Sequence, residues 1–309
     1  MDRLADISQF ESIANTAVVN RSHKRYGGTF PSSIDELIID PVASSSIDGV
    51  TGPLFLRDQK NRGYIWKPEE RCPRWGRDFD SSRNEIITDN FYRAMGVPVP
   101  NTRLYDDGKY KGRLSRFIDG SQTLLDWMVT KSPREQMAMA KEIAKNGHVD
   151  ALLRNVDLCT QNIVVDKNNI PYRVDNGCAL FYLAPHERKR WGISDISQSI
   201  VHPSPRSHGY YWLYPVFKGK NRLADVMRKI RDTNWEPGLK AVPTDYQRYL
   251  KTRIDAASQA ADYVDDLIKK GYDKGTVQKR LWELVGPQED YRKWATRLFG
   301  RGKRNGKIS

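Results

Sequence analysis

The spacing of hydrophobic and polar positions predicts short strands in the first third of the chain. Two apolar runs within residues 54–66 flank a polar turn that contains Gly63, which is the pattern of a β-hairpin. From Ser82 onward, apolar residues recur at the spacing of one helix face, and Gly96 followed by Pro98 predicts the end of this helix. A hairpin followed by a helix is therefore expected here.

The rest of the chain changes from strands to helices. Strands are predicted at residues 102–105 and 114–118, which lie on either side of an Asp-Asp-Gly turn. Residues 121–154 and 244–298 carry helical periodicity. Residues 244–298 are therefore expected to pack as a helical lobe.

Residues 151–180 combine both patterns within a short stretch. The apolar end of a helix is followed by a strand-like run at 162–165, a polar turn at 166–169 and a second run at Ile170–Val174. The order helix, loop, strand, turn, strand predicts a hairpin. Because a hairpin returns its two ends to one place, we expect polar side chains at both ends to converge.

Three such polar side chains are Asp157 in the loop, Asn162 at the start of the first strand and Asp175 after the second. Phosphoryl transfer requires a carboxylate that orients or deprotonates a hydroxyl, and oxygen ligands that bind Mg²⁺. Asp157 is the candidate base, and Asn162 and Asp175 are the candidate metal ligands. The alternative is a structural hairpin in which Asp and Asn residues cap turns.

A loop rich in hydroxyl groups and glycine precedes the first hairpin. Ser46, Gly49 and Gly52 lie in this loop, and Lys67 lies at the end of the second strand. Such a loop can place backbone N–H groups against phosphates, and a lysine one strand later can reach the same phosphates. The loop lacks the G-K-[ST] ending of a Walker A motif. The alternative is a surface hairpin with a solvated lysine.

Glu85, near the start of the predicted helix, has two interpretations. It stands three residues after Ser82, which is the spacing of a capping box. It could instead form an ion pair that holds the phosphate-binding Lys67 in place. The spacing alone favours the capping role.

Composition narrows the class of protein. The 309 residues are 39% hydrophobic, so the chain can bury a substantial core, and it has no apolar run long enough to span a membrane. Three scattered cysteines predict neither a disulfide framework nor a zinc site, and with the polar N-terminus they favour a cytoplasmic protein. The net charge of +13 makes nucleic acid a rival partner, although basic residues cluster only at 301–307 and no nucleic-acid-binding motif is present.

In their order along the chain, these segments resemble the HipA-like and phosphatidylinositol-kinase-like branch of the protein kinase superfamily. SIDGVTGPLFL resembles the phosphate loop of that branch, YIWKP its lysine strand, NEIITDNFYRAMGVPVPNTRLY its glutamate helix and LSRFIDG its hinge strand. NVDLCTQNIVV and VDNG resemble its catalytic and metal-binding segments. The resemblance covers roughly residues 44–182 and departs at 157–159, where Asp-Leu-Cys replaces the Asp-x-His of many relatives.

The resemblance implies a two-lobed, kinase-like α+β fold with a small β-rich N-lobe and a larger helical C-lobe. The N-lobe is expected at residues 44–120, and the C-lobe with the catalytic hairpin at 121–300. An N-terminal extension, 1–43, and a basic tail, 301–309, are expected on either side.

The resemblance also implies roles for individual residues. Lys67, held by Glu85, and the loop from Ser46 to Gly52 would bind the phosphates of ATP. Asp157 would be the catalytic base, and Asn162 and Asp175 would bind Mg²⁺. The expected activity is phosphoryl transfer to a hydroxyl, with a protein Ser or Thr as the first choice of substrate. The alternatives are a small-molecule or lipid kinase, a catalytically silent kinase-like binding module, and a basic nucleic-acid-binding protein.

Overall fold

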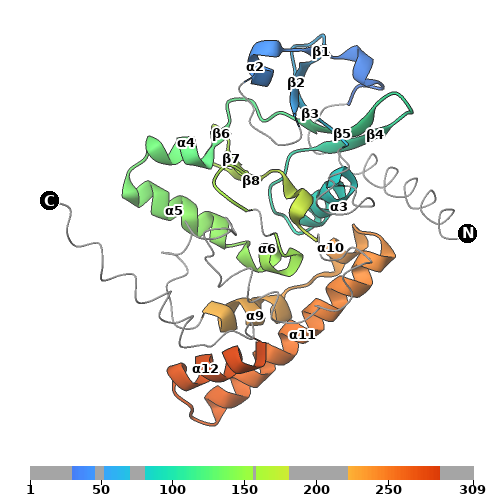
Figure 1. The fold of residues 1–309 in the computed structure, drawn as a ribbon. Helices are drawn as coiled ribbons and strands as arrows, with labels where there is room; N and C mark the ends of the chain where they lie inside the picture. The colour runs from blue at the N-terminus through green and yellow to red at the C-terminus, as the bar shows by residue number, and fades with distance from the viewer. Residues whose placement is uncertain (1–29, 46–51, 70–80, 156–157, 181–221, 286–309) are drawn as a thin grey trace, which may run out of the picture. The chain divides into compact units, whose positions relative to one another are not determined.

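The structure, a computed structural model, describes residues 30–45, 52–69, 81–155, 158–180 and 222–285 (Figure 1). The chain divides into two compact units, consistent with the two-lobed fold expected from the sequence. The first unit comprises Met1–Pro133, Thr160–Ala184 and Trp235–Gln247, and the second comprises Arg134–Cys159, Pro185–Asn234 and Arg248–Ser309. An antiparallel sheet in the first unit and helices in both confirm the α+β class.

The first unit is built on a five-stranded antiparallel sheet in the order β1-β2-β3-β5-β4. Its strands are β1 (Ile38–Ile39), β2 (Leu54–Arg57), β3 (Gly63–Pro68), β4 (Thr102–Asp106) and β5 (Lys111–Arg116). The predicted first hairpin is confirmed as β2 and β3, with Leu54 opposite Trp66. β3 pairs next with β5 rather than with β4, so β5 lies inside the sheet.

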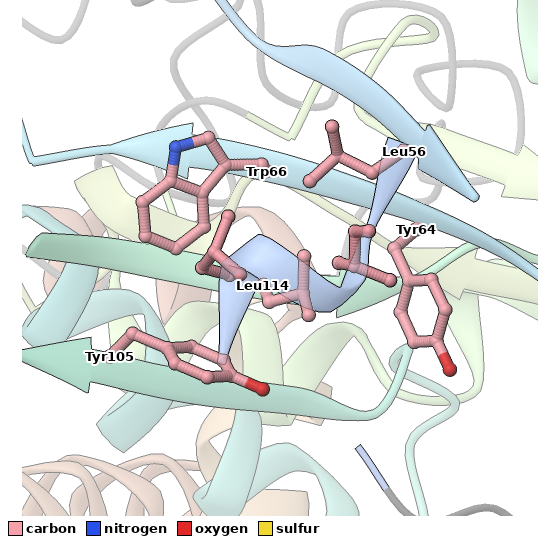
Figure 2. Packing of buried hydrophobic residues seen from close by; sticks show 7 residues of the cluster. Leu56, Tyr64, Trp66, Tyr105 and Leu114 are labelled. Carbon is pink, nitrogen blue, oxygen red and sulfur yellow. The ribbon is translucent and has the colours of Figure 1, made fainter. Parts of the chain in front are cut away.

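One face of this sheet carries an apolar core. Alternate residues of β2, β3, β4 and β5 point into it, as the period of two of a β-strand requires. Leu56, Tyr64, Trp66, Tyr105 and Leu114 pack together there, each less than 6% exposed (Figure 2). Ile34 of the short 3₁₀ helix η1 (Ile34–Glu36) and Leu37, which follows it, complete this cluster. The helix α2 (Pro41–Ser45) follows β1. The other face of the strands is mixed, because the apolar pair Phe55 and Ile65 lies on it as well as Lys67.

The helix α3 (Ser81–Ala94) corresponds to the helix predicted from Ser82 onward. Gly96 ends it with a φ of +75°, a left-handed conformation that favours glycine. Phe91 of α3 stacks on Trp235, which directly precedes α10 (Glu236–Lys240), with ring centroids 6.0 Å apart. Gly238 in α10 allows this approach, since a Cβ there would lie 2.8 Å from the Phe91 ring.

A second, three-stranded antiparallel sheet contains the hairpin predicted from residues 151–180. Its order is β6 (Gln122–Thr123), β7 (Ile163–Val165) and β8 (Pro171–Arg173). Asp166 caps the β7–β8 turn by accepting hydrogen bonds from the backbone N–H groups of Asn168 and Ile170, both at 2.8 Å. The hairpin is followed at once by the 3₁₀ helix η2 (Asn176–Cys178), and α4 (Leu124–Val129) follows β6.

The second unit is helical, as the periodicity of the sequence predicts. Its helices are α5 (Pro133–Ala144), α6 (Gly147–Leu153), α9 (Arg222–Asp232), α11 (Thr244–Lys269) and α12 (Lys274–Val285), of which α5 and α11 begin within the first unit. The buried Arg253 of α11 donates a hydrogen bond of 3.0 Å to the backbone carbonyl of Ala151 in α6. None of the helices in the described part of the chain is long and apolar enough to cross a membrane.

Candidate functional site

The face of the five-stranded sheet opposite the apolar cluster places two basic side chains next to each other. Lys67 of β3 and Arg113 of β5 are opposite one another in the antiparallel register, so their side chains leave the same face of the sheet. This is the face away from Leu114, because Arg113 and Leu114 are consecutive in the strand. The Lys67 side chain is 16% exposed and that of Arg113 is 4% exposed. Two cations this deeply buried require anionic partners.

Arg113 finds its partners on α3. One guanidinium nitrogen lies 2.7 Å from the Glu85 carboxylate, and another lies 3.9 Å from the carboxylate of Asp89. Glu85 and Asp89 are four residues apart, so both point from the same side of the helix. Arg113 also donates a hydrogen bond of 2.8 Å to the hydroxyl of Ser115. The guanidinium therefore joins β5 to one face of α3.

Lys67 pairs with Asp175, which directly precedes η2. The lysine Nζ lies 2.8 Å from Oδ1 of Asp175, whose side chain is 47% exposed. Burial raises the pKa of this carboxyl, but Lys67 and then Arg113 outweigh that effect, so the pKa lies below its ordinary value. Asp175 is therefore ionised at neutral pH and accessible to a cation. Its φ of +57° places it in the left-handed region, which Asp tolerates better than most residues.

Asn176 connects the two ion pairs. Its backbone N–H donates a hydrogen bond of 3.1 Å to the Glu85 carboxylate, and its side-chain amide donates one of 2.8 Å to Asp89. The Asn176 side chain is fully buried. The residue next to Asp175 is thus fixed to α3 at two points.

The buried acids of α3 have altered ionisation. Burial raises the pKa of Glu85 to about 7, although Arg113 and Lys67 act in the opposite direction. Burial likewise raises the pKa of Asp89, against the opposing effect of Arg113. Arg93 acts on Asp89 in the same direction as Arg113, so the three carboxylates, including Asp175, lie near three cations.

The β7–β8 hairpin brings the backbone of Asn162 close to the turn that carries Asp175. The backbone N–H of Val174 donates a hydrogen bond of 3.0 Å to the carbonyl of Asn162, which places Asn162 across from the residue that precedes Asp175. An ionised carboxylate and an amide oxygen are hard ligands that suit Mg²⁺. Within the described ranges, no three His, Cys, Asp or Glu side chains are grouped to hold a metal ion.

The ion pairs differ from the Lys67–Glu85 pair expected from the sequence. The structure joins Lys67 to Asp175 and Glu85 to Arg113. The physical reason is the pairing of β3 with β5, which places a second cation beside Lys67, and Arg113 rather than Lys67 takes the helix carboxylate. The capping interpretation of Glu85 is wrong, because its carboxylate binds Arg113 and the N–H of Asn176, and Ser82 lies inside the helix.

Several predicted site residues fall outside the described residues. These are Asp157, the candidate base, and Ser46 and Gly49 of the candidate phosphate loop. Gly52, the last residue of that loop, is described and has a φ of +59°, a conformation that glycine adopts without strain. The roles of these residues remain predictions.

Sequence reasoning missed three members of the site: Arg113, Asp89 and Asn176. The signal for Arg113 was a basic residue alternating with Gly112 and Leu114 in a strand that ends up inside the sheet. The signal for Asp89 was its position four residues after Glu85, on the same side of α3. Neither signal identifies its partner, because the pairing of β5 with β3 is not local in the sequence.

Comparisons with known proteins add little to this geometry. No family model matches the chain, and no curated protein matches it. Among solved structures, the chain is similar to the crystal structure of CtkA, a Helicobacter pylori proinflammatory kinase. The similarity has a TM-score of 0.40 at 13% sequence identity and covers 80% of this chain and 96% of the other. At this identity the likeness concerns the fold alone, assigns no residue and does not identify the HipA-like branch.

Proposed function

We propose that this protein is an ATP- and Mg²⁺-dependent phosphotransferase that acts on a hydroxyl group, with a protein Ser or Thr as its substrate class. The observation that carries the proposal is the contact of 2.8 Å between Lys67 and Asp175, with Asn162 beside the same turn. It combines a cation for phosphate oxygens with two hard oxygen ligands for a metal ion. Phosphoryl transfer needs both within one site.

Each residue has a distinct task in this proposal. Lys67 binds and neutralises phosphate oxygens of ATP, and the loop from Ser46 to Gly52 adds backbone N–H groups. Asp175 and Asn162 hold Mg²⁺, which supplies further charge neutralisation when bound. Asp157 accepts a hydrogen bond from the substrate hydroxyl and orients it.

The reaction begins at the hydroxyl group of the substrate. Its oxygen attacks the γ-phosphorus of ATP, and a new P–O bond forms as the bond from that phosphorus to the bridging oxygen breaks. ADP leaves with the electron pair of the broken bond, and the hydroxyl proton passes to Asp157. The protein contributes mainly positioning and charge, since it forms no covalent intermediate.

The test is a pair of substitutions with different expected effects. Asp175→Asn removes the charge that binds Mg²⁺, so Mg²⁺-dependent ATP binding measured by calorimetry should fall, and transfer should be lost. Asp157→Ala should abolish transfer while ATP affinity stays near that of the wild type. Asp225→Asn is the matched control, because this exposed residue of α9 pairs only loosely with Arg228, at 3.5 Å.

Transfer is measured with labelled ATP and a mixture of proteins, lipids and small molecules, so the labelled fraction identifies the substrate class. Label only in lipid or in a small molecule would reject the protein-substrate assignment and keep the phosphotransferase. Unchanged ATP binding and unchanged transfer in both variants would reject the site itself.

A further inference from the structure

Arg113 occupies a position that the proposed chemistry does not by itself require. Its side chain is 4% exposed, and it faces the carboxylates of Glu85 and Asp89, whose side chains are 4% and 1% exposed. Burying an arginine and two acids costs more free energy than burying apolar side chains of similar size. A charged group in such a place is well suited to fix the orientation of its neighbours, because its hydrogen bonds have a defined geometry.

The neighbours of Arg113 lead to the candidate metal ligand in three steps. The guanidinium contacts Glu85 at 2.7 Å and lies 3.9 Å from Asp89. These two acids receive the backbone N–H and the side-chain amide of Asn176. Asn176 is covalently bonded to Asp175, whose carboxylate contacts Lys67. We call Arg113, Glu85, Asp89 and Asn176 the Arg113 network.

The geometry of the turn at Asp175 explains how the Arg113 network can fix the position of the Asp175 carboxylate. That residue holds a left-handed conformation with a φ of +57°, which costs free energy for a residue other than glycine. Asp175 itself is half-exposed, and its carboxylate is held within the described residues by the flexible Lys67 side chain. The rigid restraint on this turn therefore comes from Asn176 and the buried groups behind it.

We infer that Arg113 is a positioning residue for metal binding, which acts by orienting Glu85 and Asp89 so that they fix Asn176 and thereby the carboxylate of Asp175. This inference rests on the proposed function, since it takes Asp175 as a Mg²⁺ ligand. Arg113 touches neither substrate nor metal in this role. In this arrangement Glu85 does not pair with Lys67 but fixes the turn that carries Asp175.

The experiment separates metal binding from nucleotide binding in the full chain. ATP affinity is measured by calorimetry without Mg²⁺, where Lys67 dominates, and then as a function of Mg²⁺ concentration. In Arg113→Met, the Mg²⁺ concentration that gives half of the Mg²⁺-dependent increase in ATP affinity should rise about 10- to 100-fold. A change of this size is typical when a residue that hydrogen-bonds a metal ligand is lost. Affinity without Mg²⁺ should change little, because Lys67 is intact. Arg113→Lys, which keeps the charge but not the two-pronged geometry, should give an intermediate value.

Arg116→Met is the matched control. Arg116 lies on the same strand but on the opposite face, where its guanidinium covers the Tyr64 ring with 4.9 Å between guanidinium carbon and ring centroid. Its Mg²⁺ dependence should equal that of the wild type. If Arg113→Met does not fold, Glu85→Gln/Arg113→Met removes one of the two unpaired acids, and Arg113→Lys retains the charge. Both are measured in the same way.

The outcomes separate the two proposals. A folded Arg113 variant with wild-type Mg²⁺ dependence would overturn the positioning role and leave the proposed function intact. Equal weakening of ATP binding with and without Mg²⁺ would also overturn it, because the defect would then be general. A wild-type protein that binds no ATP at any Mg²⁺ concentration would overturn the proposed function, and the positioning role with it.

Discussion

At the scale of single residues, the site depends on which cation takes which carboxylate. Lys67 and Arg113 lie opposite each other, and each binds a different acid. Arginine suits the buried position, because its planar fork can bind two acceptors and it stays charged when buried. Lysine suits the more exposed position next to Asp175, since its single charge can move between a carboxylate and a phosphate. The chemistry of the two side chains therefore explains why arginine occupies the buried position and lysine the more exposed one.

The raised pKa of Glu85 predicts how stability depends on pH. The folded-state pKa of about 7 exceeds the ordinary value of 4.5, so the folded protein binds more protons than the unfolded chain between these values. The stabilisation from this group is therefore complete below pH 4.5 and is lost as the pH rises through 7. We expect the free energy of unfolding of the wild type to fall between pH 5 and pH 8 by more than that of Glu85→Gln. Urea unfolding at both pH values measures the difference, and parallel pH profiles would contradict it.

Local patterns in the sequence sufficed to select four residues of the site. Each stands at the end of a strand, the start of a helix or strand, or a turn: Lys67, Glu85, Asn162 and Asp175. Their partners could not be named. The contact between Lys67 and Asp175 spans the two sheets, and that between Glu85 and Arg113 depends on strand pairing. Local periodicity contains no information on either.

At the scale of elements, hairpins were predictable and the order of strands was not. The pairs β2–β3 and β7–β8 each join neighbouring strands across a polar turn, so alternation and turn residues suffice. The insertion of β5 between β3 and β4 requires knowledge of the whole sheet. Much of the site depends on this insertion, because it places Arg113 beside Lys67.

Gly112 makes the close approach of β5 to β3 possible. A Cβ at this position would lie 2.4 Å from the Lys67 carbonyl oxygen and 2.8 Å from Cα of Pro68. Gly112→Ala should therefore displace β3 at Lys67 and lower the free energy of unfolding by about 1–3 kcal/mol, as overpacking does. ATP binding without Mg²⁺ should weaken as well, because Lys67 moves.

The matched control for this change is Lys111→Ala, the preceding residue of the same strand. Lys111 is 50% exposed and pairs with Glu69 at 3.0 Å, so its loss should cost about 1 kcal/mol or less. Urea unfolding and calorimetry on both variants make the comparison. Equal behaviour of the two variants would show that the close contact at Gly112 is relaxed at little cost.

The contact between α11 and α6 gives a second prediction at this scale. Arg253 is buried and donates a hydrogen bond of 3.0 Å to the Ala151 carbonyl in the last turn of α6, which also accepts the backbone N–H of Arg154 at 3.1 Å. Arg253→Met should lower the free energy of unfolding by about 1–2 kcal/mol, because α11 loses its charge-assisted hydrogen bond to α6. Arg248→Met, exposed on the same helix, should change it little. Urea unfolding of both variants tests the contact, which would be unimportant if their midpoints agreed.

At the scale of the whole molecule, the sequence predicted an α+β chain with two parts, and the structure agrees. The first compact unit includes residues 160–184 as well as the β-rich N-terminal part, so the hairpin that carries Asn162 and Asp175 belongs with the sheet that carries Lys67. Composition could not reveal this, since it reports the content of each segment and not its neighbours in space. The net charge of +13 is likewise a property of the whole chain. It suits either binding to nucleic acid or binding to the phosphates of ATP and an acidic substrate.

The basic tail at residues 301–309 separates these explanations. If the charge serves nucleic acid, affinity for a DNA or RNA duplex should be high at low salt and fall steeply as salt rises, with a slope set by the number of phosphates neutralised. If the protein is a phosphotransferase, deletion of the tail should leave ATP turnover nearly unchanged, because every proposed catalytic group lies more than a hundred residues earlier in the chain. We expect the deletion to spare turnover and to alter only salt-sensitive affinity for substrate. Turnover and duplex binding are measured on the same truncated protein at several salt concentrations. Two results together would favour nucleic acid over ATP as the partner. The wild type would bind no ATP in the presence of Mg²⁺, and the truncated protein would stay folded but lose tight binding to the duplex.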